Sequence, residues 1–421
     1  QTLHWNLNTD GAPSWKPLTF LFTLPYSLVH SAAEYLWVLT SAAGAFAGSV
    51  FAARIAYRLT GPSPGRRYAP FLGAIVAGLG VLGIDGYAHQ LLIANADPFT
   101  ATLCLAAIDA HLSKRPRLAF VVLVLISLGR PEAWIFAGLY GIWAWRSVPS
   151  SRLLVAVGLV LIPAIWFVVP ALTSKSWLTP GNLDSNLPTA IQGNKFTGVS
   201  SRFLGLYSWP MEVAALLAVA WAVKLRDRVT LALAGLAILW VAVEVAFALH
   251  GYSAVARYLF EPAAVMVVLA GSGVGRLLAW APDRGRVVSA VVEAAVVVAF
   301  LAALYPYIND NLSSTHQQVL AERKFARQLD RLSDVVAKVG GPAKILSCGQ
   351  PATLLQFQST VAWEVGLNVG NVSFRPGRSI GRKIPVVVLK PHDLGWQVRT
   401  YNIPHAKAAR CRQMRTDSAF G

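Results

Sequence analysis

Residues 229–249 read VTLALAGLAILWVAVEVAFAL, an apolar run with one charged residue, Glu244. The run is as long as the roughly 20 residues that an α-helix needs to cross about 30 Å of hydrocarbon. Blocks of the same character recur along most of the chain. Because a helix satisfies its own backbone hydrogen bonds in lipid, these blocks predict an all-α polytopic membrane bundle.

The composition also indicates a lipid environment. The 421 residues are 55% hydrophobic and only 14% charged, whereas soluble domains average about 25% charged residues. The formal net charge of +17 is spread over the loops between apolar blocks and over the C-terminal tail. This distribution fits orientation in a membrane and contact with anionic lipid, so we expect no nucleic-acid partner.

We expect about ten transmembrane helices. They lie at 33–57, 70–84, 88–110, 117–129, 131–146, 152–171, 209–224, 229–249, 258–280 and 285–305. Only Gly129, Arg130 and Pro131 interrupt the apolar sequence between the fourth and fifth helices. These two therefore form either a hairpin or one broken passage.

The loops between these helices alternate in their content of basic residues. One set carries Arg58, Arg66, Arg67, Lys114, Arg115, Arg117, Arg146, Arg152, Lys224, Arg226, Arg228, Arg276, Arg284 and Arg286. The other set carries Arg130, Lys175, Lys195, Arg202 and Arg257. By the positive-inside rule the richer set is cytoplasmic, so loops 1–30 and 172–208 and the tail face outside.

The chain is expected to form two domains. Residues 1–305 make the transmembrane domain, and residues 306–421 make a small extracytoplasmic α/β domain. In the tail, 317–339 has the apolar spacing of a helix, and the apolar runs at 344–347 and 386–389 read as buried strands. Cys348 and Cys411 either form a disulfide or remain two thiols in the core of this domain.

Polar residues at the outer ends of the apolar helices are the first functional candidates, because a charge within the hydrocarbon costs at least about 2.5–3.5 kcal/mol. They are Asp10, Lys16, Glu34, Asp85, His89, Asn95, Asp97, Arg130, Glu132, Glu212, Glu244, His250, Arg257 and Glu261. Inner-end charges such as Arg54, Asp109 and Arg276 are given no role, because long side chains can extend from a helix end to the water boundary.

Five short motifs resemble one family in the family's own order. They are WKPLTF at 15–20, ARIAYRL at 53–59, NADPF at 95–99, GRPEAW at 129–134 and RYLFEP at 257–262. Together they resemble bacterial GT-C glycosyltransferases of the protein O-mannosyltransferase and lipid A aminoarabinose transferase superfamily. The first two match a Lys-Pro-Pro-Leu-like motif and the helix after it. The others match the start of the fourth helix, a later helix break and the opening of a late helix.

The resemblance implies an enzyme of a bacterial plasma membrane that takes a hexosyl or pentosyl group from a polyprenyl-phosphate sugar. The acceptor is a cell-envelope glycan, lipid or protein, and transfer occurs at the outer leaflet, with inversion or retention left open. Such chemistry needs a carboxylate that accepts the proton of the acceptor hydroxyl. It also needs cations that hold the phosphate and stabilise the departing charge.

Each cationic candidate has a structural alternative. Lys16 either binds the donor phosphate or anchors the chain at the interface. Arg130 either reaches that phosphate or pairs with Glu132 across the helix break. Arg257 either contacts the phosphate or, with a slight preference, pairs with Glu261. Asn95 and His89 are supporting candidates.

Three carboxylates are candidates for the base. Asp97 begins a helix and matches the family, with stabilisation of the helix N-terminus as its alternative role. Asp85 and Asp10 lie in sequences typical of turns. The resemblance places the family's main acidic residue in the first outer loop, after a helix that would precede Gln1. Either that residue lies upstream in a longer chain, or Asp10 takes its place.

We expect no protein-only metal site, because the sequence has no Cys-x-x-Cys and no pair of histidines at helical spacing. A divalent cation, Mg²⁺ or Mn²⁺, would arrive with the donor phosphate. Two other functions compete with sugar transfer. One is a membrane transporter or flippase, in which intramembrane charges line a pathway, and the other is an inactive membrane scaffold with an extracytoplasmic binding domain.

The predicted orientation can be checked by thiol labelling in intact cells. A cysteine introduced in the 111–117 loop should resist an impermeant thiol reagent, whereas a cysteine near residue 180 should react, because the two loops lie on opposite sides of the membrane. Cell lysis should expose the first site and serves as the control. The reverse labelling pattern would invert the topology.

Overall fold

The computed structural model describes residues 15–29, 32–61, 68–173, 177–178, 190–280, 286–392 and 395–412. The chain separates into two compact units. Lys16–Val168 and Leu183–His316 form one, here called the helical unit. Gln1–Trp15, Val169–Asn182 and Gln317–Gly421 form the other, here called the C-terminal unit. Each is described by itself.

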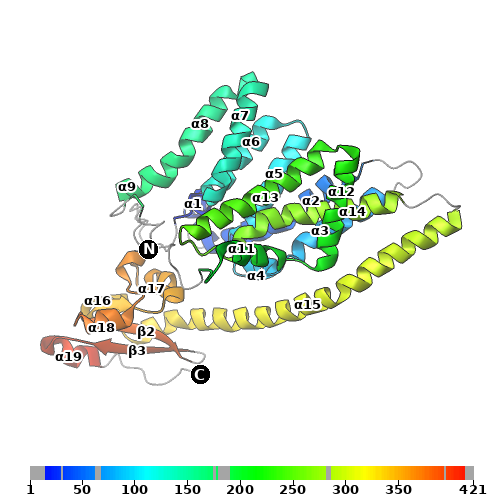
Figure 1. Cartoon of the computed structure of the whole chain (residues 1–421). Helices are drawn as coiled ribbons and strands as arrows, with labels where there is room; N and C mark the ends of the chain where they lie inside the picture. Colours follow the sequence, from blue (N-terminus) through cyan, green and yellow to red (C-terminus); the bar gives the residue numbers. More distant parts are fainter. Residues whose placement is uncertain are drawn as a thin grey trace. The chain divides into compact units, whose positions relative to one another are not determined.

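The helical unit consists of α-helices with short 3₁₀ and π segments at their breaks (Figure 1). These are α1 (Pro17–Tyr26), α2 (Ala33–Thr60), α3 (Ala69–Leu82), α4 (Tyr87–Leu92), α5 (Asp97–Leu112), α6 (Pro116–Gly129), η2 (Pro131–Ala133), α7 (Trp134–Ser147), η3 (Pro149–Ser151), α8 (Arg152–Pro163), η4 (Ala164–Val168), α11 (Lys195–Leu204), α12 (Trp209–Leu225), α13 (Arg228–Leu249), η5 (Ala256–Leu259), α14 (Phe260–Trp280) and the first part of α15 (Arg286–Lys338).

Five helices among the described residues are long and apolar enough to cross a membrane. They are Ala33–Thr60, Pro149–Thr173, Arg228–Leu249, Ala256–Trp280 and Ala290–Lys338. A sixth span results if α11 and α12, which meet at 98°, are taken as one broken passage, and α3 and α6 are shorter apolar helices. Within the described residues, the ten predicted segments coincide with helix over most of their length, while the number that cross a membrane stays a prediction.

The predicted helix at 88–110 is interrupted. α4 ends at Leu92 and α5 begins at Asp97, and between them Ala94 adopts a left-handed backbone with φ of 51°. A continuous helix is disfavoured here because Pro98 has no N–H to donate to residue 94 and its ring would clash with that carbonyl. The break puts Asp97 in the first turn of a helix rather than inside one.

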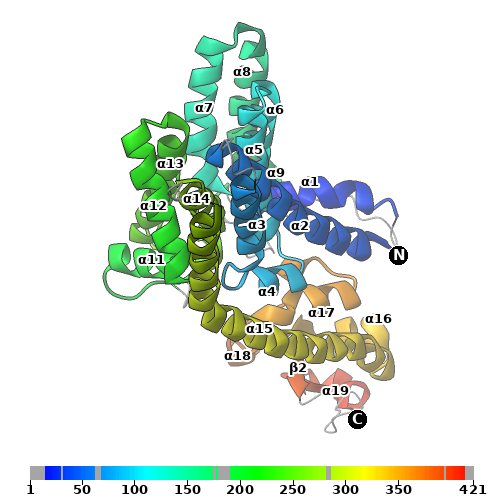
Figure 2. The same cartoon turned by 90° about the vertical axis from the view of Figure 1, so that its right-hand side faces the viewer.

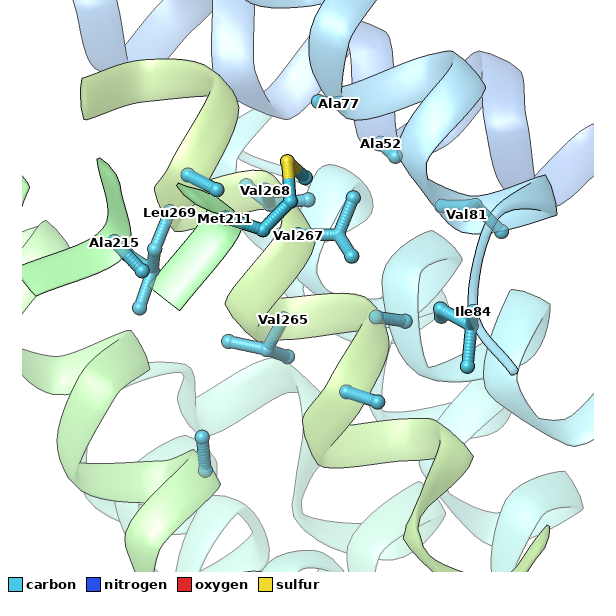
Figure 3. Packing of buried hydrophobic residues seen from close by; sticks show 14 of the residues in the cluster. Ala52, Ala77, Val81, Ile84, Met211, Ala215, Val265, Val267, Val268 and Leu269 are labelled. Atoms are coloured by element: carbon cyan, nitrogen blue, oxygen red, sulfur yellow. The ribbon is translucent and has the colours of Figure 1, made fainter. Parts of the chain in front are cut away.

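α14 forms the centre of the helical unit. Almost every residue from Phe260 to Gly275 is buried, and the helix packs against α3, α12, α2 and α13 (Figure 2). Figure 3 shows Val267 and Val268 of α14 beside Met211 of α12, with Ala77 and Val81 of α3 on the same side. Because lipid does not drive apolar helices together, such contacts depend on close van der Waals packing.

Glycines allow α14 to approach its neighbours this closely. A Cβ added at Gly271 would overlap the carbonyl oxygen of Gly73 in α3, and one at Gly273 would overlap the carbonyl oxygen of Ala214 in α12. The obstructing atoms are backbone, so neither neighbour can give way by a rotamer change. Small residues at both contacts are therefore required for the packing of the bundle.

The C-terminal unit combines helices with a three-stranded sheet in the order β1-β2-β3. Its further elements are α9 (Val169–Thr173), α16 (Gly341–Cys348), β1 (Gln350–Ala352), η6 (Leu355–Phe357), α17 (Gln358–Glu364), η7 (Val369–Asn371), α18 (Pro376–Gly381), β2 (Val386–His392), β3 (Gly395–Tyr401) and α19 (His405–Arg412). β1 is parallel to β2, and β2 pairs antiparallel with β3, with Leu389 opposite Val398. Trp396 is fully buried and its indole N–H donates to the Gln328 carbonyl of α15, 2.7 Å away.

One expectation for the tail needs correction, one is confirmed, and one open question is answered. The run at 344–347 is helical, in α16, because Gly340 with φ of 103° ends α15 and Pro342 in the first turn favours a new helix. The helix expected at 317–339 is confirmed as the last part of α15, which also contains the apolar helix before it. Cys348 of α16 and Cys411 of α19 form a disulfide, with their Cα atoms 5.9 Å apart.

Alanine substitutions test the glycine contacts. Gly271→Ala and Gly273→Ala should each destabilise the helical unit by about 1–3 kcal/mol, the usual cost of overpacking a well-filled core. Gly235→Ala in α13 is the matched control, because a Cβ there meets no atom within 4 Å. Thermal unfolding of the purified protein in detergent measures the difference. Equal unfolding midpoints for all three variants would contradict the close approach.

Candidate active site

The candidate site lies where four helix breaks of the helical unit come together. Lys16 immediately precedes α1, and Asp97 begins α5. Arg130 lies in extended conformation between α6 and η2, with φ of −140° and ψ of 112°. Arg257 lies in the 3₁₀ turn η5 before α14. Residues far apart in sequence are thus presented at helix ends, where charged groups can reach one polar cluster.

Asp97 is the centre of this cluster. Its carboxylate is 1% exposed and faces three cations. Oδ1 lies 2.7 Å from Nη2 of Arg130 and 3.7 Å from Nζ of Lys16, and Oδ2 lies 3.1 Å from Nε of Arg257. A buried carboxylate is tolerated only when it is paired in this way, so Asp97 ties three segments of the chain together.

Arg130 is the buried partner. Besides Asp97, its guanidinium pairs with Oε1 of Glu261 at 3.5 Å and donates to the backbone carbonyl of Arg257 at 3.2 Å. It also lies over the ring of Tyr258, 4.3 Å from the ring centre. These contacts use the planar, five-donor character of arginine, which a lysine would not reproduce.

Thr100 connects the Asp97 backbone with the Glu261 carboxylate. It lies one turn after Asp97 on α5, and its hydroxyl is 2.8 Å from both the Asp97 carbonyl and Oε1 of Glu261. Neither Thr100 nor Tyr258 was among the predicted site residues. The spacing of three residues from Asp97 was the available signal for Thr100, since such neighbours share a helix face.

The three cations differ in accessibility. The side chain of Arg130 is 4% exposed, whereas those of Lys16 and Arg257 are 26% and 37% exposed. An anionic ligand that approaches from solvent can therefore reach Lys16 and Arg257 but not Arg130. The cluster thus has a fixed interior and two cations at its surface.

Glu132 and Glu244 place two further buried carboxyl groups near Arg130. Glu132 belongs to η2 and Glu244 to α13, and they are 5% and 1% exposed. Among the residues that the structure describes, Oε2 of Glu132 and Oε1 of Glu244 have no hydrogen-bond partner. Both carboxylates interact electrostatically with Arg130. Arg130 therefore lies among several acidic groups, more than a single ion pair would require.

Two pairings that the sequence left open are not found as ion pairs among the described residues. Arg257 pairs with Asp97 instead of Glu261, and the ion pairs of Arg130 are with Asp97 and Glu261 instead of Glu132. Arg257 and Glu261 are four residues apart, but η5 is a 3₁₀ turn, in which that spacing does not align side chains. Arg130 is extended, as residues before proline tend to be.

The remaining candidates make other contacts or fall outside the described residues. Asp85 is exposed in the turn between α3 and α4, where its backbone N–H donates to the Leu206 carbonyl. The side-chain amide of Asn95 donates to Gln90 at 2.7 Å. His89 is half-buried on α4. Asp10 falls outside the described residues.

An apolar cavity of about 460 Å³ adjoins the cluster at Glu261. Its walls come from α5, α6, α7, α13 and α14, and Phe136 and Trp240 stack across one side with ring centres 4.9 Å apart. The lining runs along α13 from Trp240 to Arg228, a rise of about 18 Å in an α-helix. The cavity therefore extends along α13 for about this length.

The described part of the chain contains no group of three or more His, Cys, Asp or Glu side chains arranged to hold a metal ion. Asp97 and Glu261 already face cationic side chains. A divalent ion would therefore have to bring further ligands with it, such as phosphate oxygens.

Substitution of Arg130 tests its role as the buried partner. Arg130→Gln should destabilise the helical unit by about 3–5 kcal/mol, because Asp97 and Glu261 lose the cation that is buried with them. Arg257→Gln should cost about 1 kcal/mol or less, as for exposed ion pairs. Thermal unfolding in detergent compares the two, with the exposed Arg146→Gln as the control. Equal destabilisation by Arg130→Gln and Arg257→Gln would contradict this division.

Comparison with known proteins defines the fold. No protein-family model matches the sequence, and no curated protein matches it. Solved structures of ArnT from Cupriavidus metallidurans do match. The complex with undecaprenyl phosphate has a TM-score of 0.56 at 12% identity, over 93% of this chain and 88% of that chain. The apo state has a TM-score of 0.53 at 12% identity, over 90% and 83% of the two chains.

At this identity the likeness establishes the fold, and it confirms the predicted resemblance at that level. The chain has the polytopic membrane fold of ArnT.

Proposed function

We propose that this protein is a membrane glycosyltransferase of GT-C type that takes a sugar from a polyprenyl-phosphate donor. The carrying observation is the Asp97 cluster, in which a buried carboxylate holds two accessible cations, Lys16 and Arg257, next to an apolar cavity. A polyprenyl phosphate needs both features, a cationic site for its head and an apolar groove for its tail. The undecaprenyl phosphate bound to ArnT of the same fold supports this donor class.

Lys16 and Arg257 bind the donor phosphate. Both are accessible from solvent while paired with Asp97, so each cation can exchange Asp97 for an arriving phosphate. Arg130 stays in place, because it is buried and also held by Glu261 and Tyr258. The accessible cations stabilise the charge that develops on the phosphate oxygen as the sugar leaves.

Asp97 is the proposed base. When the phosphate draws Arg257 away, Oδ2 of Asp97 loses its ion-pair partner while Oδ1 keeps Arg130. Oδ2 can then accept the proton of the acceptor hydroxyl. At the same time the hydroxyl oxygen bonds to the anomeric carbon of the sugar, and the bond between that carbon and the phosphate oxygen breaks. Asp10 and Asp85 remain alternative bases, with Asn95 and His89 as supporting residues. The acceptor is a glycan, lipid or protein of the cell envelope.

The proposed setting is a bacterial plasma membrane, with the site and the C-terminal unit, predicted as 306–421, on the outer face. The loop charges support this orientation. The Cys348–Cys411 disulfide supports it independently, because such bonds persist in oxidising compartments. A transporter is disfavoured by the mostly apolar lining of the cavity, since a polar substrate would find few partners there.

Sugar transfer from the donor tests the assignments. Full-length protein in liposomes is supplied with radiolabelled polyprenyl-phosphate sugars and an envelope extract as acceptor source. Lys16→Ala and Arg257→Gln should each reduce transfer by about 10–100-fold, the equivalent of a charged hydrogen bond of about 1.5–3 kcal/mol. Asp97→Asn should reduce the turnover number most strongly. Arg146→Gln, on an exposed helix end, is the control for expression and insertion.

Retention of undecaprenyl phosphate by the purified protein separates binding from chemistry. Lys16→Ala and Arg257→Gln should weaken retention, whereas Asp97→Asn should retain the lipid. Unchanged transfer in both Lys16→Ala and Asp97→Asn would reject these roles.

A further inference from the structure

A second cavity, of about 710 Å³, lies at the other end of α5. Its polar lining comes from Arg54 and Arg58 of α2, Asp109 of α5, and Ser113 and Arg115 of the turn before α6. Asp109 is twelve residues beyond Asp97 on one helix, a rise of about 18 Å. The cavity shares no lining residue with the Asp97 cluster, so it is a separate site near the opposite membrane boundary.

The polar wall of this cavity is held in place by a buried carboxylate. Asp109 is 6% exposed, and its two oxygens lie 3.2 Å from Nη2 of Arg54 and 3.1 Å from Nη1 of Arg58. Arg58 also donates to the Ser113 hydroxyl at 2.8 Å. An arginine that extends from a helix end into water needs no buried partner. The contacts with Asp109 therefore hold these two guanidinium groups in place at the cavity wall.

Positive charge exceeds negative charge in the cavity. Three guanidinium groups, from Arg54, Arg58 and Arg115, line it together with one carboxylate, Asp109. Within the described ranges, no ion-pair partner is found for the Arg115 side chain. An anion with several acceptor oxygens would satisfy the guanidinium donors that Asp109 leaves open, and phosphate matches the planar fork of arginine.

The remaining wall is apolar. It consists of Phe51, Ala106, Ala110, Leu118 and Val122. An apolar wall beside a cluster of arginines near a membrane boundary complements an anionic phospholipid, in which the phosphate lies next to the acyl chains. A soluble phosphate would use only the polar half of the cavity.

We propose that this cavity binds a phosphate group, either of an anionic lipid head group or of a soluble phosphate. Arg54 and Arg115 donate to the phosphate oxygens, while Arg58 remains on Asp109 and Ser113. Asp109 is a positioning residue, and it keeps Arg54 at the cavity wall. The site is independent of sugar transfer and would exist in a protein of any activity with this arrangement of α2, α5 and α6.

Native mass spectrometry of the full chain tests the site. The protein is released from neutral-detergent micelles that contain phosphatidylglycerol, phosphatidylcholine or millimolar inorganic phosphate. The wild-type protein should retain one phosphatidylglycerol molecule. Arg54→Gln and Arg115→Gln should each bind this lipid about tenfold more weakly, because each substitution removes one charged contact of about 1.4 kcal/mol. Arg146→Gln, exposed at the end of α7 and absent from the cavity, should bind like wild type.

The probes identify the source of the phosphate. Retention of phosphatidylglycerol without competition from inorganic phosphate identifies a lipid head group, and competition by inorganic phosphate identifies a soluble ligand. Arg115→Lys should bind between wild type and Arg115→Gln, because it keeps the charge and loses the fork. The proposal fails if neither probe binds, or if Arg54→Gln and Arg115→Gln bind like Arg146→Gln while their unfolding midpoints match wild type.

Discussion

The pairing of Asp97 with Arg130 is the interaction on which the rest of the site depends. Both side chains are buried, at 1% and 4% exposure, and neither would be stable alone in a region with little water. Their contact fixes the start of α5 against the break between α6 and η2. Lys16, Arg257 and Glu261 then join a centre that is already neutralised, so the accessible cations can be weakly held without endangering the fold.

The helix breaks follow from the same electrostatic constraint. A charge in the middle of a membrane helix is costly, whereas a charge at a helix end can reach a partner or the water boundary. Pro17, Pro98 and Pro131 each stand directly after a charged residue of the cluster, and Pro262 directly follows Glu261. Because proline interrupts or starts a helix, it puts the preceding charged residue at a terminus. The cluster is therefore a product of local backbone chemistry repeated at four places along the chain.

Much of this organisation could be predicted from the sequence, but the pairing of charges could not. The apolar blocks gave the helices because hydrophobic length is a local property, and the short motifs brought Lys16, Asp97, Arg130 and Arg257 forward as one set. Which cation meets which carboxylate depends on backbone conformation at single residues, such as the 3₁₀ turn at Arg257. The break before Asp97 and the helix at 344–347 were missed because each depends on a proline or glycine at its edge. Arg54 and Asp109 were given no role, since nothing in the sequence indicates that they meet across two helices.

The long sequence separations within the cluster bear on how the protein is made. Arg130 donates to a carbonyl 127 residues later, and Thr100 binds a carboxylate 161 residues later. During synthesis, the early helices must leave the ribosome and enter the bilayer before η5 and α14 exist, since the N-terminal part of a chain forms first. Until then the early hairpins hold only part of the cluster, and the arrival of η5 and α14 supplies Arg257, Glu261 and the glycines that allow close packing. Insertion of α14 therefore completes both the charge cluster and the closely packed centre of the helical unit.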